Sequence, residues 1–463
     1  MVPHRDFSEE GHRATFDFSV GDYRATFFEI VIALKIAYLT AGAAGMYCGS
    51  CLHDNALAKA LIDLGHDALL IPLYTPILTD EPNVSSRRLF YGGLNVYLEQ
   101  LSRLARWLPN WSDQFLSSPR LVGWIASRAM GTSASKLGAL TVSMLKGNEG
   151  NQRKEVQRLC AWLKTLEPDV VIFSNLLIAG CIDELKSQVD SQIVVMLQGD
   201  DIFYDSLEEP YRQQAMDELR RLTQQVDLFI VHSRDYGERM QRLLGYADGA
   251  WQVNPLSIDS HDFVDLPRLE VARERPPTIG YLARLAPEKG LHLLVDAFIE
   301  IVRHPQMAEA RLSVAGWLGK QHHPYWQQQL DKLATAGLTD RLNYHGSVDR
   351  AGKLQFLQSI DVLCVPTTYK EPKGLFVLEG LAAGVPYVQP AHGAFPEMHE
   401  RIGGGYLFDP ETPDALAERL IEVFSDMAAL RELGQQGRQT LLTSDTTRHA
   451  AERLVAILKA EMR

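Results

Sequence analysis

Short apolar runs alternate with longer segments of helical period from residue 34 onward. The first unit joins an apolar run at 34–39, a small-residue loop at 41–49, a helical segment at 52–64 and another apolar run at 68–73. Such alternation predicts strand–helix–strand units with parallel strands that are buried on both faces. Further strands are predicted at 170–173, 193–197 and 228–231.

A second series of the same kind follows a charged, proline-containing linker at 259–277. Its strands are predicted at 278–282, 311–315, 342–345, 362–365, 387–389 and 406–408. The fold class is therefore α/β, with two doubly wound Rossmann-like domains at 34–260 and 278–440 that face each other across a cleft. Ligands of such sheets bind at the carboxyl ends of the strands.

Three segments depart from this alternation of strands and helices. Residues 1–33 are polar, and we expect them to form a loose, disordered extension. Residues 84–150 carry scattered aromatics and are interpreted as an insertion on the first domain. Residues 441–463 are expected to form a C-terminal helix that packs back on the N-terminal domain.

Composition and charge narrow the function classes. The 463 residues carry a net charge of −12, which argues against nucleic-acid binding because phosphate recognition requires a basic face. Five cysteines in so long a chain do not make a disulfide framework. No apolar stretch reaches the roughly 20 residues of a membrane span. We expect a cytoplasmic protein; peripheral contact with the inner membrane face and the oligomeric state are left open.

The most informative stretch runs from Glu371 to Pro386. A loop containing Glu371 leads into a helix start near Gly374, where free backbone N–H groups suit a phosphate. Glu379 lies about 7.5 Å further along the axis. One nucleotide sugar could place its sugar at Glu371, its diphosphate at Gly374, Leu375 and Phe376, and its ribose at Glu379. The alternative is that both carboxylates are solvated helix-end charges.

Two cations follow the strand at 278–282. Arg284 and Lys289 flank a turn at the carboxyl end of this strand, where an arginine fork and a lysine point charge can neutralise a diphosphate. The alternative is two surface charges.

A glycine-rich loop follows the first strand of the chain. Gly49 and Ser50 stand at its end, where backbone N–H groups or the hydroxyl could donate to a diphosphate. The same loop contains Cys48 and Cys51, a Cys-x-x-Cys at a helix start. This pair is either redox-active or a set of small loop residues, and four-cysteine zinc spacing is absent from the sequence.

These residues resemble glycosyltransferase family 4, the group 1 retaining glycosyltransferases with a two-domain B-type fold. The residues that match its motif position by position are Glu371, Gly374, Glu379, Gly384 and Pro386. The resemblance implies catalytic roles for Arg284, Lys289 and Glu371, retention of anomeric configuration, and no metal or other cofactor.

The resemblance extends to weaker positions. Gly393 and Glu397 are similar to the family's Gly-x-Pro-Glu turn, which implies contact with the donor sugar; alternatively, Glu397 caps the helix that follows. Gln198 stands where many relatives carry histidine, and it is a weak acceptor-site candidate. Asp200 either orients an acceptor hydroxyl or caps a helix.

The sequence therefore predicts a hexosyltransferase. It would move a sugar from a nucleotide sugar to a glycan, a lipid-linked acceptor or a small molecule, with the developing phosphate charge met by Arg284, Lys289 and the helix start. The alternatives are a nucleotide-sugar epimerase on the same fold and a non-catalytic sugar-nucleotide-binding protein. The base, the sugar and the acceptor are not identified.

Overall fold

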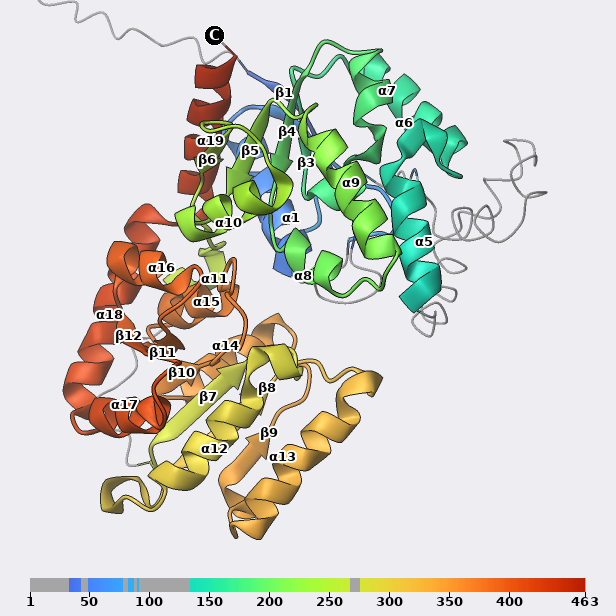
Figure 1. Cartoon of the computed structure of the whole chain (residues 1–463). Coiled ribbons are helices and arrows are strands. Elements are labelled where there is room, and N and C mark those ends of the chain that lie inside the picture. Colours follow the sequence, from blue (N-terminus) through green and yellow to red (C-terminus); the bar gives the residue numbers. More distant parts are fainter. Residues whose placement is uncertain are drawn as a thin grey trace, which may run out of the picture. The chain divides into compact units, whose positions relative to one another are not determined.

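A computed structural model describes residues 33–42, 49–77, 82–86, 90, 134–266 and 275–462 (Figure 1). The predicted extension, apart from Ala33, lies outside these residues, as do most of the predicted insertion and Cys48. Leu34–Arg463 form one compact unit, and both sheets belong to it.

The first sheet has six parallel strands. Their spatial order is β2 (Asp67–Pro72), β1 (Lys35–Thr40), β3 (Val170–Phe173), β4 (Gln192–Met196), β5 (Leu228–Val231) and β6 (Trp251–Val253). The inner strands are continuous apolar runs because helices cover both faces of the sheet. β6, a three-residue strand at the sheet edge, was not predicted.

Helices of the first part pack on both faces of this sheet. They are α1 (Gly49–Asp63), α5 (Ala134–Leu145), α6 (Arg153–Leu166), α7 (Ile182–Lys186), α8 (Asp200–Asp205), α9 (Tyr211–Thr223) and α10 (Arg234–Leu244), with short 3-10 turns η2 (Gly147–Glu149) and η3 (Leu176–Cys181). α1 packs on the face that carries Tyr38, Met196 and Ile230. The opposite face packs Leu159 and Leu219 from α6 and α9.

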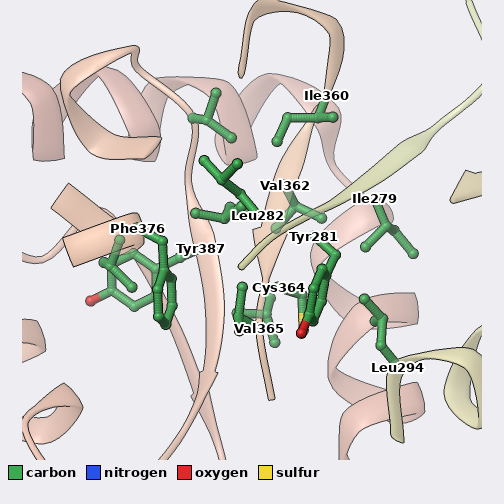
Figure 2. Close-up of a cluster of buried hydrophobic side chains, with 14 of the residues drawn as sticks. Ile279, Tyr281, Leu282, Leu294, Ile360, Val362, Cys364, Val365, Phe376 and Tyr387 are labelled. Atoms are coloured by element: carbon green, nitrogen blue, oxygen red, sulfur yellow. The ribbon is translucent and has the colours of Figure 1, made fainter. Parts of the chain in front are cut away.

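The second sheet repeats this architecture. Its order is β12 (Gly405–Phe408), β11 (Tyr387–Pro390), β10 (Val362–Cys364), β7 (Thr278–Leu282), β8 (Arg311–Ala315) and β9 (Leu342–Tyr344), and every neighbouring pair is parallel. Figure 2 shows Ile279, Tyr281, Val362 and Tyr387 among the buried side chains of its core. The predicted α/β class with two doubly wound parallel sheets is confirmed.

The helices around the second sheet are α12 (Leu291–Ile301), α13 (His323–Thr335), α14 (Arg350–Ser359), α15 (Leu375–Ala382), α16 (Phe395–Ile402), α17 (Ala415–Phe424) and α18 (Met427–Ser444). The short helix α11 (His261–Val264) lies in the linker, and the 3-10 turns are η4 (Pro287–Lys289), η5 (Pro305–Met307), η6 (Lys320–His322) and η7 (Thr339–Arg341). α18 runs past residue 440, where the second domain was expected to end.

The last helix, α19 (Thr447–Glu461), packs against α1 (Figure 1). Its buried side chains Ala451, Leu454 and Leu458 share one cluster with Leu57 and Leu61 of α1. The chain therefore returns to the first sheet after it has completed the second.

Candidate functional site

Glu371 is the centre of the densest polar cluster at the carboxyl edge of the second sheet. It lies in the loop between β10 and α15 and is only 4% exposed. Its Oε2 accepts from Lys289 Nζ at 2.6 Å and from the Tyr369 hydroxyl at 2.5 Å. Its Oε1 accepts from the backbone N–H groups of Lys373 and Gly374, at 3.3 Å each.

The charge of Glu371 follows from these contacts. Burial alone would raise the pKa of this carboxyl, but the Lys289 ammonium and the bonds from Lys289, Tyr369 and Gly374 outweigh burial and lower the pKa to about 2. Burial and the adjacent carboxylate in turn raise the pKa of Tyr369. Glu371 is therefore a fixed negative charge at neutral pH.

The two predicted cations differ in their surroundings. Lys289 ends η4 with its side chain 13% exposed, and its ammonium lies over the rings of Tyr369 and Phe376 as well as on Glu371. Arg284 is half exposed and pairs with Glu288 at 3.1 Å. The fold therefore places Lys289 in the Glu371 cluster and leaves Arg284 at its margin.

Glycines shape the backbone around this cluster. Gly374 caps α15 with φ +73°, and a Cβ there would stand 2.9 Å from Phe395 Cε1. A Cβ on Gly393 would stand 2.5 Å from the carbonyl oxygen of Glu371, because Ala394 N–H donates to that oxygen at 2.8 Å. Only glycine permits both the left-handed turn and this close approach.

Glu379 lies further along α15. Its carboxylate accepts from Lys353 Nζ of α14 at 2.7 Å. The pair lines a pocket together with Leu375 and with His53 of α1. A ribose diol that bound Glu379 would therefore have to share or replace the lysine contact.

The start of α1 meets the start of α15. The Ser50 hydroxyl accepts from Lys373 Nζ at 2.5 Å. A Cβ on Gly49 would stand 3.7 Å from Leu375 Cδ2, in ordinary contact. Cys51 is buried, and Cys48, the other member of the Cys-x-x-Cys, lies outside the described residues.

Glu397 is engaged at a helix start in the first half of the chain. Its two oxygens accept from the backbone N–H groups of Arg234 and Asp235, each at 2.7 Å, at the first turn of α10. Capping was expected for the helix after Glu397, but these contacts cap α10. Each of the two carboxylate oxygens of Glu397 therefore has a backbone donor.

Gln198 and Asp200 follow β4 in the chain, and both side chains are buried. Asp200 accepts from the N–H groups of Leu176, the first residue of η3, and of Gln198, at 2.7 and 3.1 Å. Burial raises the pKa of Asp200 to about 6. Gln198 Nε2 donates to Asp54 Oδ1 at 2.9 Å.

Sequence reasoning missed several members of the site. They are Tyr369, Lys353, Lys373, His53, Asp54 and His232. Lys373 could have been found, since it stands between Glu371 and Gly374 in the motif. Tyr369 lies two residues before Glu371 in the same loop. Tertiary packing brings in the other four.

The described part of the chain has neither a cluster of metal-ligating side chains nor a helix that could span a membrane. No group of three His, Cys, Asp or Glu side chains is placed there to hold a metal ion. None of the helices in this part is long and apolar enough to cross a membrane.

The second half of the chain matches a known family. Residues 266–440 fit the family model described as glycosyl transferases group 1. The phosphatidyl-myo-inositol mannosyltransferase of Mycobacterium tuberculosis H37Rv is 30% identical over 179 residues, which cover 37% of this chain and 44% of that protein. Mannosylfructose-phosphate synthase of Agrobacterium fabrum is 24% identical over 38% of this chain and 39% of that protein. The chain thus aligns with less than half the length of these curated relatives.

Solved structures resemble the fold over nearly the whole chain. Sucrose-phosphate synthase from Thermosynechococcus elongatus has a TM-score of 0.66 at 17% identity, covering 92% of this chain and 98% of that one. Anabaena Alr3699/HepE, solved in complex with UDP and glucose, has a TM-score of 0.60 at 16% identity, covering 92% and 99%. Residues 266–440 therefore match the model of glycosyl transferases group 1, and the chain has the two-sheet B-type fold of these solved structures.

Proposed function

We propose that the protein is a retaining, metal-independent glycosyltransferase that moves a hexosyl group from a nucleoside-diphosphate sugar to a hydroxyl acceptor. The observation that carries the proposal is the Glu371 cluster: a buried carboxylate, its lysine partner and a glycine-capped helix start meet at the carboxyl edge of one sheet. This is where nucleotides bind in doubly wound folds.

Each part of the donor has a partner in this arrangement. The diphosphate would lie on the N–H groups at Gly374, Leu375 and Phe376, with Lys289 and Arg284 to neutralise it. The ribose diol would bind Glu379, and the sugar would lie beside Glu371. Gly49 and Ser50 would approach from the other side, because Ser50 already contacts Lys373.

The departure of the diphosphate determines which protein groups the reaction requires. As its bond to the anomeric carbon breaks, negative charge develops on the phosphate oxygens, and preorganised cations and N–H groups stabilise that charge. Family resemblance favours attack by the acceptor from the same side, with retention. The named relatives are transferases or synthases, which favours transfer over epimerisation, and a solved fold neighbour binds UDP and glucose.

The test is binding and turnover of UDP-, GDP- and ADP-sugars by the purified protein, with Glu379→Ala and Arg284→Ala as variants. Arg303→Ala serves as a control, since this exposed arginine pairs with Glu300 of α12. We expect one donor to bind and to be slowly hydrolysed, with both properties reduced at least about tenfold in the two site variants. Absence of binding by all donors, or equal behaviour of site and control variants, would refute the donor site.

A further inference from the structure

The start of α19 lacks the usual side-chain cap. Thr446 is the N-cap residue, but its hydroxyl lies 2.8 Å from His449 Nδ1 and makes no bond to a backbone N–H of the helix. The N–H of Thr447 donates to the carbonyl oxygen of Ile258 at 2.9 Å. The N–H groups of Arg448 and His449 have no acceptor in the part of the chain that the structure describes. Two donors of the first turn are therefore open, at the end of a helix that attracts negative charge.

A buried hydroxyl at the same helix start also lacks a partner. The Thr447 side chain is only 7% exposed, and its Oγ1 is buried without a hydrogen-bond partner among the described residues. Buried polar atoms in native proteins are nearly always hydrogen-bonded. The unpaired hydroxyl therefore points to a ligand group that the described chain does not supply.

The first turn of α19 lines one pocket together with two other segments. Thr447 and Arg448 line it from α19, Lys59 lines it from α1, and Ser260 lines it from the linker before α11. Figure 1 shows α19 beside α1. This pocket, here called the α19 pocket, is not lined by Glu371, so it is separate from the cluster of the proposed donor site.

Two cations of the α19 pocket are held only loosely. Lys59 pairs with Asp63 at 2.9 Å, and these side chains are 42% and 57% exposed. Arg448 pairs with Glu452 at 3.0 Å, and these side chains are 69% and 46% exposed. Exposed pairs of this kind contribute little to stability, so both cations can turn toward a charged ligand at small cost.

The carboxylates of the α19 pocket already have donors of their own. Asp63 accepts from Lys59, and Asp259 Oδ1 accepts from the N–H of His261 at 3.0 Å. The groups without partners, in contrast, can all donate: two backbone N–H groups and the Thr447 hydroxyl. A ligand that fits them supplies several acceptors at one point. A phosphate group does so, because it carries negative charge and at least three strong acceptor oxygens.

We propose that the α19 pocket binds a phosphate group, whose oxygens accept from the N–H groups of Arg448 and His449 and from the Thr447 hydroxyl. The side chains of Lys59 and Arg448 supply the opposite charge. The ligand is inorganic phosphate or the phosphate monoester of a small metabolite. Bound there, it ties the start of α19 to α1 and to the linker. The inference goes beyond the proposed function and does not depend on it.

Calorimetric titration of the full chain at constant ionic strength tests this site. The probes are inorganic phosphate, glycerol 3-phosphate and glucose 6-phosphate, and an excess of glycerol or glucose should not displace them. We expect at least one phosphate compound to bind. Thr447→Val keeps the shape of the side chain and removes the hydroxyl, so affinity should fall at least about tenfold because a hydrogen bond to a charged group is lost. Tighter binding of an ester identifies a metabolite as the ligand, and equal affinities identify free phosphate.

Two further variants locate the binding. Arg448→Met should weaken it about threefold, because an exposed counter-charge is lost. Arg242→Met is the matched control, since Arg242 pairs with Glu238 four residues before it in α10 and these side chains are 72% and 51% exposed; this variant should bind like the parent. Lys289→Met removes the cation of the Glu371 cluster and should change phosphate affinity less than about twofold.

Thermal unfolding without ligand checks the premise that the Thr447 hydroxyl is unpaired. Thr447→Val should then melt at the temperature of the parent or above it, because no hydrogen bond is lost, and a clearly lower melting temperature would contradict the premise. Absence of binding by all three phosphate compounds, or equal binding by parent and Thr447→Val, would overturn the inference. So would binding that disappears in Lys289→Met and persists in Thr447→Val, since phosphate would then lie at the proposed donor site. Failure of every nucleotide sugar to bind would refute the proposed function alone.

Discussion

Replacing Lys289 with methionine tests the electrostatics of the Glu371 cluster directly. The side chains of the ion pair are only 13% and 5% exposed, so the remaining carboxylate would be a buried charge without its cation. Tyr369 and the Gly374 N–H would remain as its donors. The variant therefore removes the Lys289 charge and its hydrogen bonds, and it leaves the other hydrogen bonds of Glu371 in place.

The expected magnitude follows from the pKa of Glu371. A carboxyl whose pKa falls from 4.5 to about 2 on folding contributes about 3 kcal/mol in its ionised form. That contribution is complete above pH 4.5 and is lost as the pH falls toward 2. In Lys289→Met, burial dominates and raises the pKa of Glu371, so we expect a loss of about 3 kcal/mol at pH 7, in line with broken buried pairs generally.

Urea unfolding followed by tryptophan fluorescence at pH 7 and pH 4 measures the difference in the free energy of unfolding between the parent and Lys289→Met. The gap between parent and Lys289→Met should narrow at pH 4, where the buried carboxyl of the variant can be protonated. Lys332→Met is the control, because Lys332 pairs with Asp296 at the same 2.6 Å on the surface and should contribute less than about 1 kcal/mol. Equal losses in the two variants at pH 7 would refute the reasoning.

Three further predictions concern backbone contacts and pH. Glu397→Gln should lower the free energy of unfolding by about 1 kcal/mol, because a charged cap of α10 is lost, whereas Glu400→Gln on the same helix should change little; urea midpoints at pH 7 decide this. Gly374→Ala should cost at least about 1 kcal/mol, since φ is +73° there, and should also weaken nucleotide binding measured by calorimetry; an unchanged midpoint would contradict the left-handed cap. Burial raises the pKa of Asp200 from 3.8 to about 6, so ionisation opposes folding and stability is lost as the pH rises through this range. Asp200→Asn should show a flatter stability profile between pH 4 and 6, and a profile parallel to the parent would speak against this titration.

Local pattern was enough for most strands and for the motif. The strands at 170–173, 228–231, 278–282 and 311–315 were predicted to the residue, because buried parallel strands are short, mainly apolar runs between polar turns. Gly374 indicated a helix start in the sequence. In the structure it caps α15 in the left-handed conformation. β6, the three-residue strand Trp251–Val253 at the edge of the first sheet, was not predicted.

The sequence by itself determined the order of strands and helices, the α/β class and the residues of the motif at 371–386. The spacing of apolar residues that predicts these elements is a property of neighbouring positions in the chain. Tertiary structure alone decided their partners. It set Lys289 on Glu371, left Arg284 with Glu288, and brought Glu397 to the start of α10, 163 residues away. It also brought the start of α19 to α1, because contacts between helices depend on how distant segments pack.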